Sequence, residues 1–265
     1  MTLESNCINY IRKCHKCQIY VNKIHVLPSP LYVMVSPWLF SMWGMDVIGP
    51  ITPKASNEHR FIFVVIDYFT KWVEAASYAS VTKSVVTRFI KRKIICQYRL
   101  LKRIISDNDL NLNNDMMTEV CARFKIKHHN SAPYRPKMNG AVEAAKKNVK
   151  KIITKATKTY KDWHEKLPFA LHAYQTGVRT SIGATLYSLV HGMEAVLPIE
   201  VEIPSLRVLR KVELKEAEWV QARYEQLNLI EEKRMKAICH GQLYQKRMMR
   251  AHDKKSNPDS SKKEN

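Results

Sequence analysis

The sequence predicts an α/β fold built on a five-stranded mixed sheet, and two patterns in the first 160 residues predict it. Three apolar, β-rich runs precede the first amphipathic helix, and from there helices and strands alternate. Strands joined by short turns pair antiparallel, whereas strands joined through a helix pair parallel. We therefore expect an antiparallel edge, parallel middle strands and helices packed against the sheet.

The first three strands come from consecutive runs. The first strand is predicted by WGMDVIGP (43–50), which Gly49-Pro50 ends. The second is RFIFVVIDYF (60–69), which is apolar and β-branched and therefore buried, and the third is TKWVEAASYAS (70–80), which alternates in polarity. A tight turn joins the last two, so they form an antiparallel pair.

The alternating part begins with Thr82, which is placed to cap a helix. The apolar positions of that helix, with the stem of one lysine, are Val85, Val86, Phe89, Ile90, Lys93 and Ile94. LLKRIISDN (100–108) predicts the fourth strand, Asn114 caps a helix through MMTEVCARF (116–124), and KIKHH (125–129) is a short fifth strand.

A strongly basic helix is predicted over residues 139–158. At about 100° per residue, its buried stripe consists of Val142, Ala145, Val149, Ile153 and Ala156. Glu143, Lys147 and Lys150 form the adjoining stripe, where the helix leaves the core.

Two further helices follow. The helix in DWHEKLPFALHAYQT (162–176) should turn inward Trp163, Leu167, Leu171 and Tyr174. Residues 213–250 predict a long amphipathic helix with one side formed by Ala217, Val220, Tyr224, Leu227 and Ile230. The polar end, SNPDSSKKEN, should be disordered.

The composition favours a polyanionic partner. The formal net charge of the 265 residues is +20, which nucleic acid would match best. The alternative is a basic protein whose lysines only solvate its surface. No apolar run approaches the roughly 20 residues of a membrane span, no secretory signal is visible, and six cysteines without one indicate a reducing compartment. We expect no membrane partner.

Three acids on separate elements predict a metal site. Asp46 lies inside an apolar strand, Asp107 ends the fourth strand, and Glu143 opens the basic helix. Parallel neighbouring strands lie about 4.8 Å apart, so both aspartates could reach one cation, which would relieve their repulsion. Each acid also has a purely structural interpretation. Asp46 could accept backbone N–H groups, Asp107 could serve a turn, and Glu143 could complement the helix dipole and pair with Lys147.

The chain strongly resembles the integrases of gypsy-type long-terminal-repeat retrotransposons over about residues 6–250. The matching motifs are WGMDVIGP, FVVIDYFTKWVEA, RIISDN, HHNSAPYRPKMNGAVEAA and TSIGATLYSLVHGMEAVLPIEVEIPSLRV. Thirty-five residues separate Asp107 from Glu143, a spacing typical of retroviral-type integrases.

This resemblance implies a ribonuclease-H-like core that performs phosphoryl transfer on DNA with two Mg²⁺ or Mn²⁺ ions. Asp46 would bridge the ions, with Asp107 and Glu143 as flanking ligands. Water attacks when element ends are trimmed, and the new 3′-OH attacks when they are joined to target DNA. The residues it implies for DNA contact are Asn108, Tyr134, Lys137, Asn139, Lys146, Lys147, Lys150 and Lys151.

The resemblance also implies three parts. These are the remnant of a zinc-binding head with a linker (1–36), an integrase catalytic core (37–200) and a basic helical extension with a disordered tail (201–265). Cys14 and Cys17 have zinc-knuckle spacing, but the family's upstream His pair is missing, so we expect no stable zinc site. No terminal β-barrel or chromodomain follows the long helix, which predicts a truncated copy with impaired integration.

One departure falls beside the predicted site. Asp109 stands where the family has glycine, and a positive φ there would strain it. Two other functions stay open: a catalytically inactive nucleic-acid-binding remnant and a ribonuclease H, against which the GAVEAA helix argues. A homo-oligomer and a nuclear location are expected from the family and its substrate.

Overall fold

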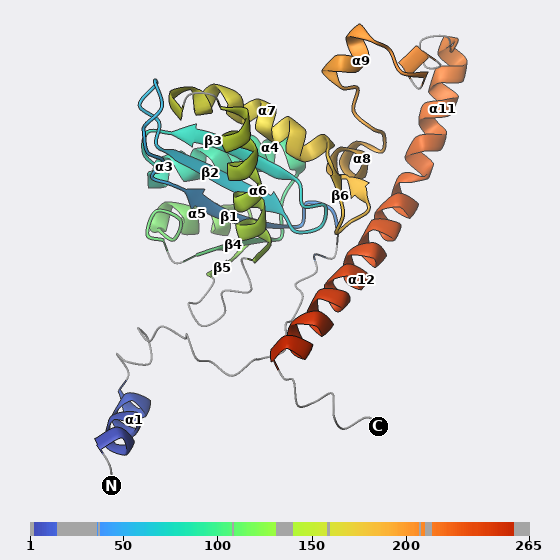
Figure 1. The fold of residues 1–265 in the computed structure, drawn as a ribbon. Helices are drawn as coiled ribbons and strands as arrows, with labels where there is room; N and C mark the ends of the chain where they lie inside the picture. The colour runs from blue at the N-terminus through green and yellow to red at the C-terminus, as the bar shows by residue number, and fades with distance from the viewer. Residues whose placement is uncertain are drawn as a thin grey trace, which may run out of the picture. The chain divides into compact units, whose positions relative to one another are not determined.

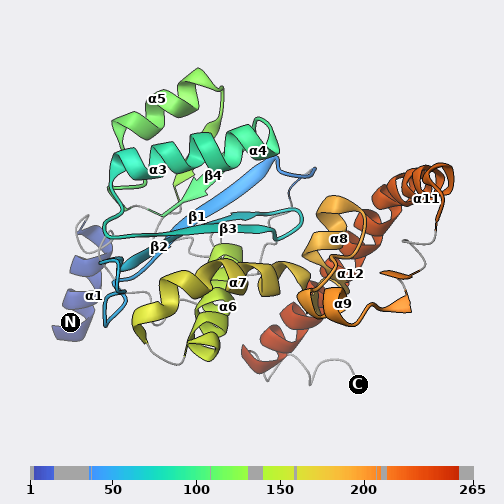
Figure 2. The ribbon, with the colours of Figure 1, turned by 90° about the horizontal axis from the view of Figure 1, so that it is seen from above.

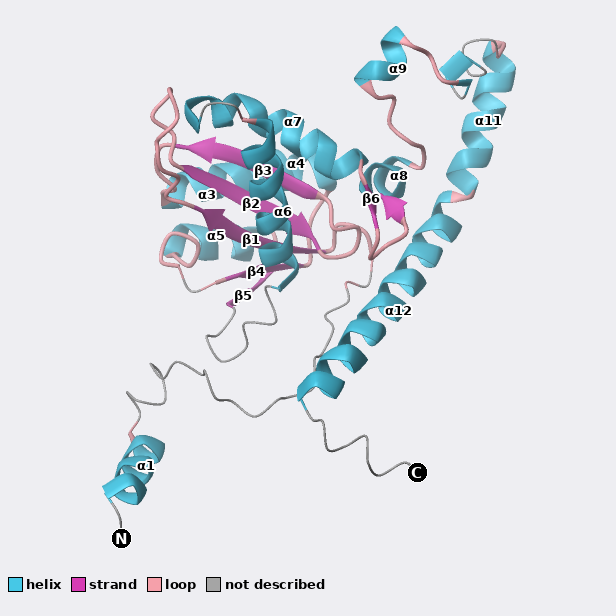
Figure 3. Ribbon diagram, viewed as in Figure 1, coloured by secondary structure: helices cyan, strands magenta, loops and turns pink. Residues whose placement is uncertain are grey.

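The computed structural model describes residues 3–14, 36, 38–107, 109–130, 140–157, 160–206, 208–209 and 214–256. Its centre is a five-stranded sheet of order β3-β2-β1-β4-β5 (Figure 1; Figure 3). The strands are β1 (Met42–Ile48), β2 (Phe61–Asp67), β3 (Val73–Tyr78), β4 (Arg103–Ser106) and β5 (Lys127–Asn130).

The pairing directions confirm the predicted mixed sheet. β1 pairs with β2, and β2 with β3, in antiparallel register. β4 runs parallel to both β1 and β5. The parallel middle strands therefore direct their carboxyl ends toward one edge of the sheet, where Asp46 and Asp107 lie.

Helices cover both faces of the sheet (Figure 2). One face carries α3 (Lys83–Phe89), the π-helix η1 (Ile90–Ile95), α4 (Cys96–Tyr98) and α5 (Asp115–Arg123). The other carries α6 (Gly140–Ala156), the 3₁₀ turn η3 (Tyr160–Asp162) and α7 (Trp163–Thr176). Thr82 and Asn114 cap α3 and α5 as predicted, since their side-chain oxygens accept the N–H groups of Val85 and Met117.

The helix after Thr82 differs from the regular α-helix that its pattern predicts. The Cys96 N–H donates to the Lys91 carbonyl, five residues back, so the middle of the helix is a π-turn. Lys93 is exposed instead of packing its stem inward, which leaves its charged group in water. The other predicted positions, except the half-buried Val85, are buried: Val86, Phe89, Ile90 and Ile94.

The buried faces of α6 and α7 follow the sequence pattern closely. In α6 the predicted stripe is buried at Val142, Ala145, Val149 and Ile153, while the side chain of Ala156 lies outside the described ones. In α7 the buried residues are Trp163, Leu167, Ala170 and Tyr174. Leu171 is only half-buried against the core, because Ala170 takes the inward position beside it.

Beyond α7 the chain forms a small hairpin and a series of helices. They are β6 (Val178–Arg179), β7 (Ala184–Thr185), α8 (Leu186–His191), α9 (Pro198–Glu202), α11 (Glu216–Asn228) and α12 (Ile230–Ser256). The predicted long C-terminal helix is present, with a break at Leu229. Its predicted apolar side is not buried, since Val220 and Tyr224 are more than half exposed. Contact with α8 comes instead from two arginines: Arg234 Nε donates to the Leu189 carbonyl at 2.9 Å, and Arg223 donates to the His191 carbonyl at 3.1 Å.

The chain divides into two compact units, one of Met1–Leu31 with Asp253–Asn265 and one of Tyr32–His252. The sheet lies in the second. The first contains α1 (Leu3–Lys13), which ends just before Cys14. Cys17 lies outside the described residues, so the pairing of Cys14 with Cys17 stays a prediction. The predicted domain boundaries at residues 36 and 200 stay predictions as well. Within the described chain, every helix is too short or too polar to cross a bilayer.

Candidate active site

Asp46 lies near the carboxyl end of β1, with only 4% of its surface exposed. An apolar strand buries it because its neighbours Met45 and Ile48 belong to the core. Its Oδ1 accepts the N–H of Val47 at 2.6 Å, so the purely structural interpretation is correct for one of its oxygens. The other oxygen, Oδ2, faces α6.

Gly44 brings α6 close to this part of β1. Side chains two residues apart on a strand point to the same face, so Gly44 and Asp46 both face α6. A Cβ at Gly44 would lie 2.4 Å from Val142 Cγ2 and 2.8 Å from Tyr68 Cε2. Only glycine leaves the room that this approach requires. Gly44 was not predicted to belong to the site, although a glycine inside a strand is a sign of close backbone approach.

The second turn of α6 supplies the ion-pair partner of Asp46. The Lys146 Nζ lies 2.9 Å from Asp46 Oδ2 and 3.4 Å from Glu143 Oε1. Two acids almost a hundred residues apart in the sequence therefore share one ammonium group. Glu143 pairs with the lysine at i+3, not with Lys147 at i+4 as the structural alternative had it. Its side chain is 48% exposed, so its carboxylate is also open to solvent.

The charges of these three groups depend on one another. Burial raises the pKa of Asp46 to about 6, although Lys146 and the Val47 N–H lower it, and the negative charge of Glu143 raises it further. Burial alone would lower the pKa of Lys146, but its hydrogen bond to Asp46 and its two carboxylate neighbours outweigh that effect and raise it. The ammonium thus stabilises the charged form of Asp46.

Asp107 is not gathered with the other two acids. The parallel register pairs Gly44 with Ile105, and continuing it by two residues places Asp107 beside Asp46. Its Oδ1 instead accepts the Asp109 N–H at 3.2 Å, as in an ordinary Asx turn. Among the described residues, no group of three or more His, Cys, Asp or Glu side chains is placed to hold a metal ion. The structure therefore brings together two of the three predicted ligands.

Asp109 is not among the described non-glycine residues with positive φ, so the structure gives no sign of the cost that such a conformation would carry. Its backbone supports the turn with Asp107, and its Oδ1 accepts the N–H of Asn111 at 2.9 Å. An aspartate suits this position because its side chain makes a second turn of the same kind.

The donor chemistry of the two gathered acids fits a hard divalent cation. Carboxylate oxygens are the ligands that Mg²⁺ and Mn²⁺ prefer. Asp46 and Glu143 already hold one positive group between them, the Lys146 ammonium, which occupies the place that a metal ion would take. Asp107 follows the neighbouring parallel strand and is the nearest candidate for a third ligand by register.

The residues predicted to contact DNA divide into two sets. Asn108, Tyr134, Lys137 and Asn139 lie outside the described residues. Of the four α6 lysines predicted to contact DNA, Lys146 is occupied by the acids, and Lys147, Lys150 and Lys151 are exposed. A positively charged side of α6 therefore continues from the two acids along the helix.

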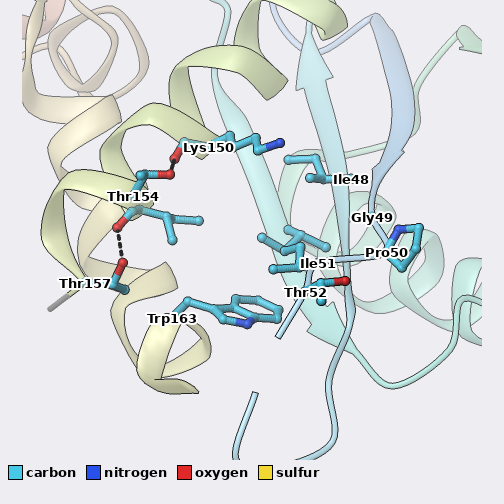
Figure 4. A pocket seen from close by; sticks show the side chains of 11 residues that line it. Ile48, Gly49, Pro50, Ile51, Thr52, Lys150, Thr154, Thr157 and Trp163 are labelled. Atoms are coloured by element: carbon cyan, nitrogen blue, oxygen red, sulfur yellow. Dashed lines mark hydrogen bonds between the residues drawn. The ribbon is translucent and has the colours of Figure 1, made fainter. Parts of the chain in front are cut away.

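A cavity of about 520 Å³ lies farther along the same side of α6. It is lined by the chain that leaves β1, from Ile48 to Thr52, and by α6 and Trp163 (Figure 4). Lys150 extends its ammonium group toward Ile48, whereas the Thr154 hydroxyl donates back to the Lys150 carbonyl (Figure 4). The groove between β1 and α6 is thus apolar at its base and basic at its rim.

Sequence comparisons relate this region to integrases. A family model described as "Integrase core domain" matches residues 40–136, which include Asp46 and Asp107 and end before Glu143. The Tf2-3, Tf2-4 and Tf2-5 transposon polyproteins of Schizosaccharomyces pombe are each 25% identical over 201 residues, or 74% of this chain. The chain spans 15% of the length of these polyproteins.

A structural comparison supports the fold. A chain from the cryoEM structure of the simian T-cell lymphotropic virus intasome in complex with PP2A regulatory subunit B56 gamma matches with a TM-score of 0.54. The two share 20% identity, and the match covers 74% of this chain and 69% of that chain. The fold is ribonuclease-H-like, as the resemblance to integrases implied.

Proposed function

We propose that this chain is an integrase-type polynucleotidyl transferase that acts on DNA, of the gypsy-type retrotransposon group. One observation carries the proposal: Asp46 and Glu143, on different elements, share the Lys146 ammonium within a ribonuclease-H-like fold. The match of residues 40–136 to the integrase core domain supports the reaction class. The net charge of +20 supports a polyanionic substrate.

In this proposal Asp46, Glu143 and Asp107 hold two Mg²⁺ or Mn²⁺ ions. Bound cations would supply activation of the attacking oxygen and stabilisation of the leaving 3′ oxygen in an in-line displacement. Burial of Asp46 keeps its carboxylate fixed against α6, while the exposed Glu143 faces the side from which DNA would arrive. Asp107 has to leave its turn with Asp109 to take part.

The basic side of α6 would bind the DNA backbone. Lys147, Lys150 and Lys151 are exposed and lie on the helix that carries Glu143. Contacts of this kind supply affinity and register without reading sequence. We further propose that the chain works as a homo-oligomer on element ends and target DNA in the nucleus, where that substrate is found.

Reversal of strand transfer tests the reaction without knowledge of the element ends. In a labelled branched duplex, a 3′-OH beside the branch attacks the branch phosphodiester, one P–O bond forms and one breaks, and the released strand keeps the new 3′-OH. With Mn²⁺ we expect this exchange, and we expect Asp46→Asn to abolish it. Glu119→Gln is the matched control, since Glu119 is an exposed acid on α5, on the opposite face of the sheet.

The outcomes separate the competing functions. Exchange that survives Asp46→Asn would refute the assignment. Salt-sensitive DNA binding without exchange in any version would indicate the catalytically inactive nucleic-acid-binding remnant. Cleavage confined to the RNA strand of a hybrid would indicate a ribonuclease H.

A further inference from the structure

We propose that the Lys146 ammonium is a built-in counter-cation of the candidate active site, which a divalent ion must displace before the carboxylates can hold it. This inference rests on the proposed function, because it concerns the metal that the function requires. It assigns Lys146 to the acids first and to DNA only after displacement.

The contacts of Lys146 place it where a metal ion would have to lie. Its Nζ is 2.9 Å from Asp46 Oδ2 and 3.4 Å from Glu143 Oε1, so it occupies the space between the two acids. Among the ion pairs of the described residues, those of Asp46 and Glu143 both run to this nitrogen. With Oδ1 engaged by the Val47 N–H, Oδ2 is the oxygen that Asp46 has left to offer.

Burial makes this pairing strong. Asp46 is 4% exposed, and a buried carboxylate needs a partner to compensate for lost hydration. The Lys146 side chain is 27% exposed, so its ammonium is partly shielded from solvent and salt. The pair is therefore unlike the exposed ion pairs of the surface, which contribute little.

A divalent ion and the ammonium cannot share these oxygens. Mg²⁺ binds oxygen at about 2.0–2.1 Å, so it would have to take the position in front of Oδ2 that Nζ now fills. The two cations would also repel each other at that separation. Metal binding in this chain therefore includes the cost of breaking both Lys146 contacts, and its affinity is lower than the carboxylates alone would give.

Displacement would give Lys146 a second partner. It is carried on a flexible four-carbon stem three residues after Glu143, on the helix whose exposed lysines follow it. Once released, its ammonium can reach a phosphate that approaches the same acids. Metal entry would thus add one positive group to the DNA-binding side of α6.

Manganese binding to the full chain tests the competition. Lys146→Gln keeps an N–H donor for Asp46 but removes the charge, and Lys147→Gln removes an exposed charge one residue away as the matched control. By calorimetry or by electron paramagnetic resonance of free Mn²⁺, we expect Lys146→Gln to bind at least about tenfold more tightly than wild type, or about 1.4 kcal/mol. The change for Lys147→Gln should stay within about twofold, because water and salt screen an exposed charge.

These titrations distinguish the displacement of Lys146 from the metal site that the proposed function requires. Equal tightening by both variants would overturn the inference and leave the proposed function standing, since the metal would still bind. Binding that is absent from wild type and from Lys146→Gln, or that Asp46→Asn does not weaken, would overturn the metal site and the inference together.

A measurement on the unaltered chain avoids any effect of the substitutions on folding. Lysine acylation read by mass spectrometry should find Lys146 protected without metal and reactive once Mn²⁺ is added. The reactivity of Lys147 should stay the same. Unchanged protection of Lys146 at saturating Mn²⁺ would show that the ammonium is not displaced.

Discussion

Replacing Gly44 with alanine should move α6 away from β1. The new Cβ would lie 2.4 Å from Val142 Cγ2 and 2.8 Å from Tyr68 Cε2, well inside ordinary van der Waals contact. Val142 is fully buried, so its branched side chain has no open space to turn into. The backbone of α6 is the part that has to give, and α6 carries Lys146, the ion-pair partner of Asp46, together with Glu143.

The expected cost can be worked from this contact. Overpacking a core costs about 1–3 kcal/mol. The lower chain entropy of alanine in the unfolded state offsets about 0.4–1 kcal/mol of it. We therefore expect Gly44→Ala to lower the free energy of unfolding by about 1–2 kcal/mol, with the Lys146–Asp46 contact lengthened as a consequence.

A double-mutant cycle with Val142 isolates the contact. Val142→Ala alone removes two buried methyl groups and should cost about 2 kcal/mol, from lost burial and a small cavity. In the double variant the alanine at 44 fills the space that the valine methyl leaves. The double variant should therefore lose about 1–2 kcal/mol less free energy of unfolding than the sum of the two single losses.

Urea denaturation of the four proteins measures these free energies, and manganese binding reports whether α6 has moved. Strict additivity of the two substitutions would refute the argument, because it would mean that Gly44 and Val142 do not compete for one space. A Gly44→Ala variant with an unchanged free energy of unfolding and unchanged manganese affinity would also refute the argument.

Three further predictions concern other parts of the molecule. Burial raises the pKa of Asp67 to about 6 despite its hydrogen bonds from Thr70, so the folded state holds this proton more tightly than the unfolded state does. The free energy of unfolding should then fall as pH rises from about 4 to 6, by up to about 3 kcal/mol, and Asp67→Asn should lack this loss. Asn114→Ala removes the cap that accepts the Met117 N–H and should cost about 1 kcal/mol in urea denaturation. If the basic side of α6 binds DNA, Lys150→Met should reduce by about one the slope of log affinity against log salt in a fluorescence anisotropy titration.

Each of these has its own comparison. Asp46 also has a raised pKa, but it is present in both proteins, so the difference between wild type and Asp67→Asn isolates Asp67. Identical pH profiles would contradict the prediction. Asn113→Ala, at an exposed neighbour of the cap, should be close to neutral, and an equal loss in the two variants would rule out a capping effect. An unchanged salt slope for Lys150→Met would place the DNA elsewhere.

The sequence was sufficient for the sheet because local pattern and chain connection decide it. Alternation and β-branched runs define the five strands, and the helices between the later strands require parallel pairing. The caps at Thr82 and Asn114 were equally visible, since a cap depends on residues three positions apart.

Features that depend on tertiary contact were not visible in the pattern. The π-turn at Ile90–Ile95 interrupts the α-helical hydrogen-bond pattern, which the apolar periodicity did not predict. The exposed side chains of Val220 and Tyr224 show the same limit, since an apolar side of a helix does not reveal whether another element covers it. Lys146 was recognised as basic, but its choice of Asp46 depends on how closely α6 approaches β1.

The geometry of the candidate site therefore depends on two different levels of the structure. Extending the parallel register of β1 and β4 by two residues beyond Gly44 and Ile105 sets Asp46 opposite Asp107, so the sheet itself decides this part of the site. The position of Glu143 depends on Gly44. Glu143 and Lys146 come close to Asp46 only while α6 lies against a strand that has no side chain at residue 44. The ammonium then holds the two acids together, and Asp107 remains in its own turn. If the proposed function holds, closing the site onto a divalent ion would require two local exchanges, one at Lys146 and one at the Asp109 N–H, and no change in the sheet.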